Sequence, residues 1–367
     1  MDVELSFFKT KMELLHPFTT SFGTQTHRNA FVLRLRSGDV TAYSECVTDE
    51  GPYYSYEDNE TAMHVIRMFL ADMIADLPKP TVFLERAEAI KGHNMAKAAL
   101  EMLLMDYHAR AAGVQILAGL GEQKGYADVG ISIGMDSIEL MLKQVGKAVE
   151  RGYRRVKVKV KRGREFEIVS SIREVYGDIQ LSIDANTDYK LADMEALKRL
   201  DRFDLVYMEQ PLGHDDLLDH AKLASEISTP ICLDESITSA HAAEQAFGIG
   251  ACSVINIKPG RVSGLSESVR IAEVCRSNGG HCWVGGMLET GIGRAFNISL
   301  GSLKNVDYPG DTSPNDRYFQ KDLVRNPFVM EEGRIQAPSG PGCGADVDGR
   351  RLAEVSVEKG VIFRKRR

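Results

Sequence analysis

Residues 156–161 read Val-Lys-Val-Lys-Val-Lys, a period of two that puts three valines on one face of a strand and three lysines on the other. Short apolar strands are predicted around this segment, and amphipathic helical patterns alternate with them. The predicted strands cover residues 129–133, 155–160, 180–183, 205–208, 231–233, 253–257 and 282–284, with a weaker eighth near Val306. Repeated strand–helix units of this kind require a parallel sheet, either closed into a barrel or open.

The lysine face is unusual, because a buried parallel strand is normally apolar on both faces. An exposed edge strand would explain residues 156–161 about as well as a functional role would. A closed barrel has no edge strand, so the choice depends on whether the sheet closes. No Gly-x-Gly-x-x-Gly follows the first predicted strand and no Gly-Lys-Ser/Thr loop is present, so open nucleotide-binding sheets lose support. We therefore predict a barrel.

Five charged residues stand at the ends of consecutive predicted strands, at intervals of 25, 25, 25 and 24 residues: Lys159, Asp184, Glu209, Asp234 and Lys258. One strand–helix unit has about that length, so the five residues take equivalent places on five strands. In a TIM barrel this place is the carboxyl-terminal rim, where active sites form.

The three acids of this set predict a metal site. Singly, Asp184, Glu209 or Asp234 would be read as a helix cap or a solvated loop residue. Together they would point at one centre and repel one another unless a cation neutralised them. Oxygen ligands without histidine or cysteine suit Mg²⁺.

The lysines predict acid–base chemistry. A partly desolvated ammonium group beside another cation loses its proton more readily, so Lys159 is a candidate base and Lys157 its perturber. Lys258 could reach the opposite face of the same substrate carbon from across the barrel. Arg261 is a candidate for tuning Lys258, and a surface role for it is an equal alternative. The glycine-rich segment 285–293 follows a strand and opens a helix, and its amide groups are predicted to face an anion such as a carboxylate, although glycines also make plain turns.

The composition and net charge of the chain limit the classes of partner that it is expected to bind. The chain of 367 residues is 43% hydrophobic and 26% charged, which is ordinary for a soluble globular protein. A net charge of -7 argues against nucleic-acid binding. Six scattered cysteines without a Cys-x-x-Cys pair fit a reducing compartment. Because no apolar run approaches membrane-spanning length and no signal peptide is recognisable, we expect a cytoplasmic protein without nucleic-acid or membrane partners.

Several motifs together resemble the muconate-lactonizing branch of the enolase superfamily, and within it the o-succinylbenzoate synthase / N-succinylamino acid racemase group. They are the Lys-x-Lys of Lys157 and Lys159, Asp184-Ala185-Asn186, Met208-Glu209-Gln210-Pro211, Leu233-Asp234-Glu235-Ser236, Ile257-Lys258-Pro259-Gly260, Ser44-Glu45-Cys46, Gly51-Pro52-Tyr53-Tyr54-Ser55, the segment 286–294 and Tyr308-Pro309-Gly310-Asp311.

The resemblance implies an α/β fold, a modified TIM barrel (β/α)₇β with an α+β capping domain. Residues 1–122 would begin the cap, 123–322 form the barrel, and 323–367 return to the cap. It further implies Mg²⁺, with Mn²⁺ as a possible substitute, on Asp184, Glu209 and Asp234. Lys159 and Lys258 would be the acid–base pair, supported by Lys157, Asn186, Glu235 and Arg261. Substrate contacts are expected from Phe18, Phe22, Ser132, Gly286, Met287, Gly291 and Ile292.

The implied activity is the Mg²⁺-dependent dehydration of 2-succinyl-6-hydroxy-2,4-cyclohexadiene-1-carboxylate to 2-succinylbenzoate, a step of menaquinone synthesis. Racemisation of N-succinylamino acids is the alternative or a companion activity, because both reactions use the same five residues. Dipeptide epimerisation and muconate cycloisomerisation are more distant alternatives. A catalytically silent barrel that binds a metal or an acidic metabolite is a remote one, because all five residues are present. The partner is thus expected to be a small carboxylate, and barrels of this size often form homo-oligomers.

Overall fold

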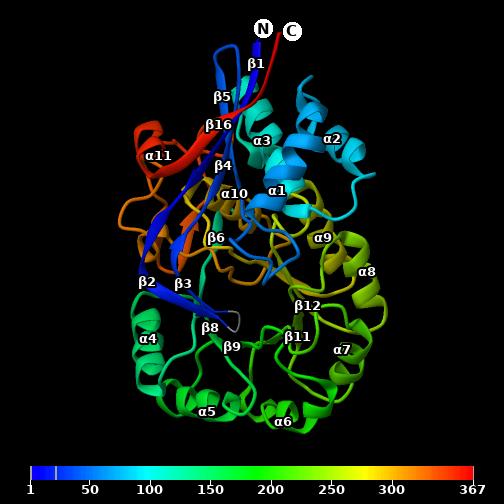
Figure 1. Cartoon of the computed structure of the whole chain (residues 1–367). Coiled ribbons are helices and arrows are strands. Elements are labelled where there is room, and N and C mark those ends of the chain that lie inside the picture. Colours follow the sequence, from blue (N-terminus) through cyan, green and yellow to red (C-terminus); the bar gives the residue numbers. More distant parts are fainter. Residues whose placement is uncertain (1, 21–22, 367) are drawn as a thin grey trace.

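The computed structural model describes residues 2–20 and 23–366 and shows a ring of strands and helices below a smaller sheet with helices (Figure 1). The ring contains a parallel seven-stranded sheet in the order β13-β12-β11-β10-β9-β8-β7. Its strands lie close to the predicted ranges: β7 (Gly130–Ile133), β8 (Arg155–Lys159), β9 (Leu181–Asp184), β10 (Met208–Glu209), β11 (Ile231–Leu233), β12 (Val254–Ile257) and β13 (His281–Val284). The prediction of repeated parallel strand–helix units is confirmed.

Helices connect these strands and pack around the outside of the ring (Figure 1). They are α4 (Ile138–Glu150), α5 (Glu165–Tyr176), α6 (Met194–Lys198), α7 (Leu217–Ala224), α8 (Ala240–Gly248), α9 (Leu265–Ser277) and α10 (Gly291–Gly301). The spacing of apolar residues in α4 explains why this helix packs on the outside of the sheet. Met141, Val145 and Ala148 lie on one face of the helix and are buried against the sheet, while the opposite face is polar.

Residues 308–311 close the ring, as an extended segment between β13 and β7. The Tyr308 amide donates to the Cys282 carbonyl oxygen at 3.1 Å, and the Asp311 amide donates to that of Val284 at 2.8 Å. On the other side, the Gly130 amide donates to the Gly310 carbonyl oxygen at 2.7 Å. The eighth barrel segment is therefore residues 308–311, close to Val306, near which an eighth strand was predicted. Val306 itself is in a turn, in which its amide donates to the Leu303 carbonyl oxygen.

Closure explains the alternating valines and lysines of β8. This strand lies between β7 and β9, so the edge-strand interpretation is wrong. Val156 and Val158 are in the hydrophobic core, whereas the side chains of Lys157 and Lys159 point into the barrel and are 3% and 8% exposed. Lys161 lies beyond the end of the strand and is exposed.

The second part, called the cap here, is a sheet with strand order β16-β1-β4-β5 together with a hairpin and three helices. The sheet strands are β1 (Asp2–Thr10), β4 (Phe31–Ser37), β5 (Val40–Cys46) and β16 (Ser356–Arg366). Because β16 pairs antiparallel with β1, the two ends of the chain lie side by side (Figure 1). The hairpin of β2 (Met12–Thr20) and β3 (Gly23–Arg28) extends from this sheet towards the barrel (Figure 1).

Helices α1 (Asn59–Val65), α2 (Pro80–Ala87) and α3 (Asn94–Ala112) cover one face of the cap sheet. A π-helical turn (Ile66–Leu70) and a short 3₁₀ helix (Ala71–Ile74) continue α1. The remaining strands and α-helix of the described residues are β6 (Tyr126–Asp128), β14 (Met330–Glu331), β15 (Arg334–Gln336) and α11 (Gly349–Val355). Short 3₁₀ helices lie at Ile116–Gly119, Leu191–Asp193, Asp201–Phe203 and Asn315–Arg317. Among the described residues, none of the helices has the length and apolar character needed to cross a membrane.

Two buried carboxylates join the cap to the barrel by capping barrel helices. Glu101 of α3 accepts hydrogen bonds from the Leu265 amide at 3.1 Å, the Ser266 amide at 3.0 Å and the Ser266 hydroxyl at 2.6 Å, at the start of α9. Glu45 of β5 accepts from the Thr290 hydroxyl at 2.7 Å and the Gly293 amide at 3.2 Å, at the start of α10. A negative charge at a helix N-terminus is stabilised by the unpaired amides there.

Replacing Glu101 by Gln should make the protein less sensitive to pH. Burial raises the pKa of Glu101 to about 7 from an ordinary 4.5, so the folded state binds a proton more tightly than the unfolded chain. That contribution to stability is present below pH 4.5 and is lost as pH rises towards about 7. Between pH 4.5 and about 7 the original protein should lose about 3 kcal/mol of its free energy of unfolding that the Glu101→Gln variant keeps, measured by urea unfolding at several pH values. Glu354→Gln, an exposed change on α11, is the control; an equal pH response in Glu101→Gln and the original would contradict the prediction.

Candidate active site

A cavity of about 300 Å³ lies where the cap meets the carboxyl ends of the barrel strands. The cap contributes residues of the β2–β3 hairpin and of the segment after β5. The barrel contributes strand-end and loop residues, so the cavity is at the rim where the sequence predicted an active site. Its walls include Phe18, Thr24, Gln25, Asp49, Tyr53, Tyr54, Ser132, Lys157, Lys159, Asp184, Asn186, Lys258, Gly286, Met287, Leu288, Arg294, Asp311 and Tyr318.

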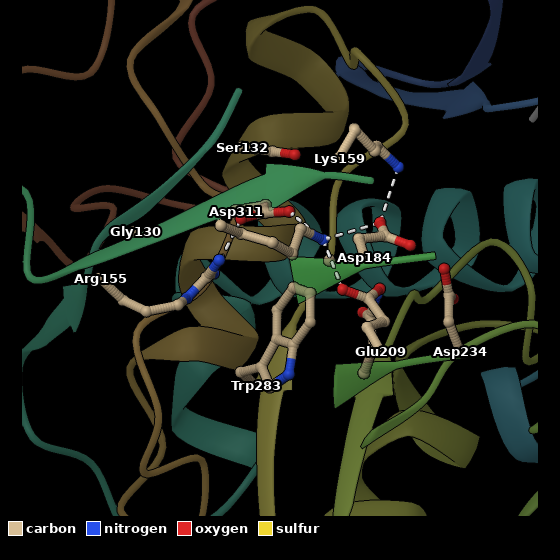
Figure 2. A network of polar contacts seen from close by, with 12 residues as sticks. Gly130, Ser132, Arg155, Lys159, Asp184, Glu209, Asp234, Trp283 and Asp311 are labelled. Atoms are coloured by element: carbon tan, nitrogen blue, oxygen red, sulfur yellow. Dashed lines mark hydrogen bonds and ion pairs between the residues drawn. The ribbon is translucent and has the colours of Figure 1, made fainter. Parts of the chain in front are cut away.

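The three predicted acids stand on neighbouring strands. Asp184 ends β9 and Glu209 ends β10, and the two are partners in the parallel register. Asp234 follows β11, and its amide donates to the side-chain oxygen of Gln210 at 2.9 Å. All three carboxylates are buried and project into the same space (Figure 2). Within the described part of the chain they are paired with cationic side chains and are not gathered tightly enough to count as a preformed metal cluster.

Lys157 stands at the centre of these charges. Its ammonium lies 2.6 Å from Glu209 Oε2, 2.9 Å from Asp311 Oδ2 and 3.4 Å from Asp184 Oδ2. The ammonium also lies 4.6 Å from the centre of the Trp283 ring, a cation–π distance. Burial alone would lower the pKa of Lys157, but the carboxylates outweigh it and the pKa is raised well above its usual value. Lys157 therefore remains a cation inside the barrel.

Lys159 is held by the next strand of the barrel. Its ammonium donates to Asp184 Oδ2 at 2.6 Å and to Asn186 Oδ1 at 2.5 Å. The amide of Asn186 in turn faces Glu235 Oε1 at 3.5 Å, while Glu235 Oε2 is buried and has no hydrogen-bond partner among the described residues. The side chains of Asp184 and Asn186 thus orient Lys159 towards the cavity.

Lys258 faces the same cavity from the other side. Its ammonium donates to Asp234 Oδ2 at 2.7 Å and to the Tyr54 hydroxyl at 3.1 Å. Arg261 is only 5% exposed and donates to Asp234, to Tyr54 and to two backbone carbonyl oxygens, so the surface role considered for it is wrong. The two lysines and three acids are therefore brought together, with an amine on either side of the acids.

The charges at this rim are not fully balanced. Burial raises the pKa of Glu209 to about 7, and repulsion from Asp184 and Asp234 adds to that effect. For Asp234, burial acts in the same direction, but Lys258 and Arg261 outweigh it and lower the pKa to about 2. An added cation would favour the ionised form of Glu209. Carboxylate oxygens alone are a donor set that suits Mg²⁺.

The glycine-rich segment differs from expectation. The Thr290 and Gly293 amides donate to Glu45, the Gly291 amide to Asp322 at 2.9 Å, and the Met287 amide to Glu289 at 2.8 Å. These amides were predicted to face a substrate anion, but carboxylates of the protein itself already occupy them. Gly286 and Met287 line the cavity, whereas Gly291 and Ile292 are buried in the first turn of α10, away from the lining.

The remaining predicted contacts lie at the cavity wall. Ser132 is the last residue but one of β7 and lines the cavity (Figure 2). Its hydroxyl is buried without a hydrogen-bond partner among the described residues. Phe18 lines it from β2. Phe22 lies outside the described residues.

Three residues with direct contacts to the site were missed. Tyr54 contacts Lys258 and Asp234, Asp311 contacts Lys157, and Asn256 donates to Glu209 Oε1 at 2.8 Å. Asn256 sits two positions before Lys258 on the same strand face, which was the available signal. Asp311 ends the eighth barrel segment, residues 308–311, so two further steps of about 25 residues beyond Lys258 would have led to its neighbourhood.

Comparison with known proteins agrees with this architecture. Residues 2–121 match the family model "Mandelate racemase / muconate lactonizing enzyme, N-terminal domain", and residues 140–351 match "Enolase C-terminal domain-like". An N-succinylamino acid racemase from Amycolatopsis sp is 44% identical, covering 96% of both chains. An o-succinylbenzoate synthase from Geobacillus kaustophilus is 42% identical, covering 93% of this chain and 92% of the relative. A solved enolase-superfamily structure from Listeria innocua superposes with a TM-score of 0.94 at 35% identity, covering 98% of each chain. The chain belongs to the enolase superfamily.

Proposed function

We propose that the protein is an o-succinylbenzoate synthase, which removes water from 2-succinyl-6-hydroxy-2,4-cyclohexadiene-1-carboxylate. The observation that carries the proposal is the pair of buried amines, Lys159 and Lys258, facing one cavity across three carboxylates. Support for the substrate comes from relatives named o-succinylbenzoate synthase, which are 35% to 42% identical over most of the chain.

Asp184, Glu209 and Asp234 would hold Mg²⁺. Their oxygen donors fit that ion, and the raised pKa of Glu209 marks a place where one more positive charge stabilises the site. Superfamily members in general combine a Lys or His base with Mg²⁺. When bound, Mg²⁺ supplies positive charge that stabilises negative charge developing on the substrate carboxylate. Lys157 and Asn186 would keep the acids and Lys159 in place.

The lysines do the proton chemistry. After its ammonium has released a proton to solvent, Lys159 takes, as a neutral amine, the proton from the carbon next to the carboxylate, which breaks the C–H bond. It then returns that proton to the departing hydroxyl group, so the C–O bond breaks and water leaves. Lys258 remains protonated on the other face and holds the negative charge that builds up between the two steps. Burial alone would lower the pKa of Lys258, but Asp234 outweighs it and the pKa is raised, which suits a group that must stay charged.

N-succinylamino acid racemisation is the second candidate, supported by the 44% identical relative of that name. Amines on both sides of the acids are the arrangement that racemisation needs, because one takes the α-proton and the other returns it to the opposite face. A catalytically silent barrel is disfavoured, because Lys159, Asp184 and Lys258 line one cavity and the other two acids, Glu209 and Asp234, form ion pairs with Lys157 and Lys258 beside it.

Purified protein supplied with Mg²⁺ and the cyclohexadiene substrate should form 2-succinylbenzoate, followed by its ultraviolet absorbance. Lys159→Ala should abolish turnover, because both proton steps use that amine, with a loss of at least about 10²–10⁴-fold. Lys161→Ala, an exposed change two residues away, is the matched control and should retain full activity. Full turnover by Lys159→Ala would refute the mechanism. No dehydration by the original protein, together with deuterium exchange at the α-carbon of N-succinylamino acids, would reverse the order of the two activities.

Mg²⁺ should raise the midpoint of thermal unfolding, because an ion that binds only the folded state stabilises it. Saturating Mg²⁺ at about a hundred times its dissociation constant corresponds to about 2.7 kcal/mol. Glu209→Gln should remove most of this shift, whereas the exposed Glu331→Gln should keep it. An equal Mg²⁺ shift in both variants would show that the ion binds elsewhere.

A further inference from the structure

Tyr54 brings a cap side chain into contact with the proton-transfer machinery of the barrel. It lies in the segment between β5 and α1, 204 residues before Lys258 in the chain. Its hydroxyl oxygen is 3.1 Å from Lys258 Nζ, 3.1 Å from Arg261 Nη1 and 3.0 Å from Asp234 Oδ1. It therefore touches a proposed acid–base residue and a proposed metal ligand at once.

The direction of each hydrogen bond follows from chemistry. A lysine ammonium and an arginine guanidinium can only donate, and an ionised carboxylate can only accept. A tyrosine hydroxyl has one hydrogen and two lone pairs. The Tyr54 hydroxyl must therefore accept from Lys258 and Arg261 and donate to Asp234, which uses its whole hydrogen-bonding capacity. Its orientation has no freedom left.

The ring of Tyr54 adds a third restraint. Lys258 Nζ lies 4.2 Å from the ring centre, within cation–π range. The ammonium is thus held by Asp234 Oδ2 at 2.7 Å, by the Tyr54 hydroxyl and by the Tyr54 ring. Two of these three contacts come from one cap residue, Tyr54. Lys258 nevertheless remains part of the cavity wall.

Lys159 is restrained differently. Its partners, Asp184 and Asn186, lie at the end of the neighbouring barrel strand. Among the described residues, no aromatic ring lies within cation–π range of Lys159 and no cap side chain hydrogen-bonds to it. The two amines therefore depend on different parts of the fold.

We propose that Tyr54 is a positioning residue for Lys258 alone, so that the cap aims the amine on one face of the substrate while the barrel by itself aims the amine on the other. The proposal rests on the proposed two-amine chemistry. It predicts that loss of Tyr54 slows proton removal from one enantiomer and not from the other. Misfolding would not produce this difference, because it would slow proton removal from both enantiomers.

The experiment is enantiomer-specific exchange. D and L N-succinylamino acids are each incubated with the Mg²⁺-saturated protein in D₂O, and loss of the α-proton signal is followed by NMR before much racemisation occurs. Lys258→Ala first identifies the enantiomer whose proton Lys258 removes. Tyr54→Phe keeps the ring but removes the hydroxyl. It should slow exchange of that enantiomer by about tenfold, the size typical of losing one hydrogen bond to a charged group, and leave the other rate unchanged.

Tyr56→Phe is the matched control, since Tyr56 lies in the same segment, is 59% exposed and packs against His93 rather than Lys258. Both of its exchange rates should equal those of the original protein. Equal slowing of both enantiomers by Tyr54→Phe, no slowing of either, or slowing that disappears at higher Mg²⁺ would each overturn the proposal. Absence of exchange by the original protein would refute racemisation at this site, and the proposal with it, while formation of 2-succinylbenzoate by the same protein would leave the proposed dehydration standing.

Discussion

Buried charge must be compensated, and this requirement governs the rim of the barrel. Lys157, Asp184, Glu209 and Asp234 are all at most 3% exposed, where an unpaired charge would cost several kcal/mol. The structure meets this cost by placing cations beside the three acids, so that each acid touches an amine or a guanidinium. Such an arrangement contributes little net stability compared with apolar packing. Its value is that it fixes where each functional group points.

The same requirement explains how the cap is attached. Glu45 and Glu101 are fully buried and accept hydrogen bonds at the starts of two barrel helices. The N-termini of α9 and α10 are therefore used to hold the cap. Because the cap is fixed beside the rim in this way, a side chain such as Tyr54 can reach Lys258 with hydrogen-bond accuracy.

The sequence predicted the barrel and its charged rim because both depend on local periodicity. Strand–helix repeats have a nearly constant length, so Lys159 and Asp184 fall at matching strand ends and are register partners in the structure. Contacts that depend on tertiary docking were not predictable in this way. Glu45 meets Thr290 across 245 residues, which is why the amides of the glycine-rich segment were assigned to a substrate. Tyr54 carries no periodic signal that could mark it.

The proposed dehydration and the proposed racemisation would share the acids and amines of the rim, although dehydration keeps Lys258 charged and racemisation uses it to move a proton. Both substrates would also contact the wall that the charges leave open, where Phe18, Met287, Leu288 and Tyr318 line the cavity. An apolar wall discriminates weakly between substrates, about 1–3 kcal/mol for each methylene gained or lost. Under the proposed function, such a wall would admit both substrates and would not by itself separate the two reactions.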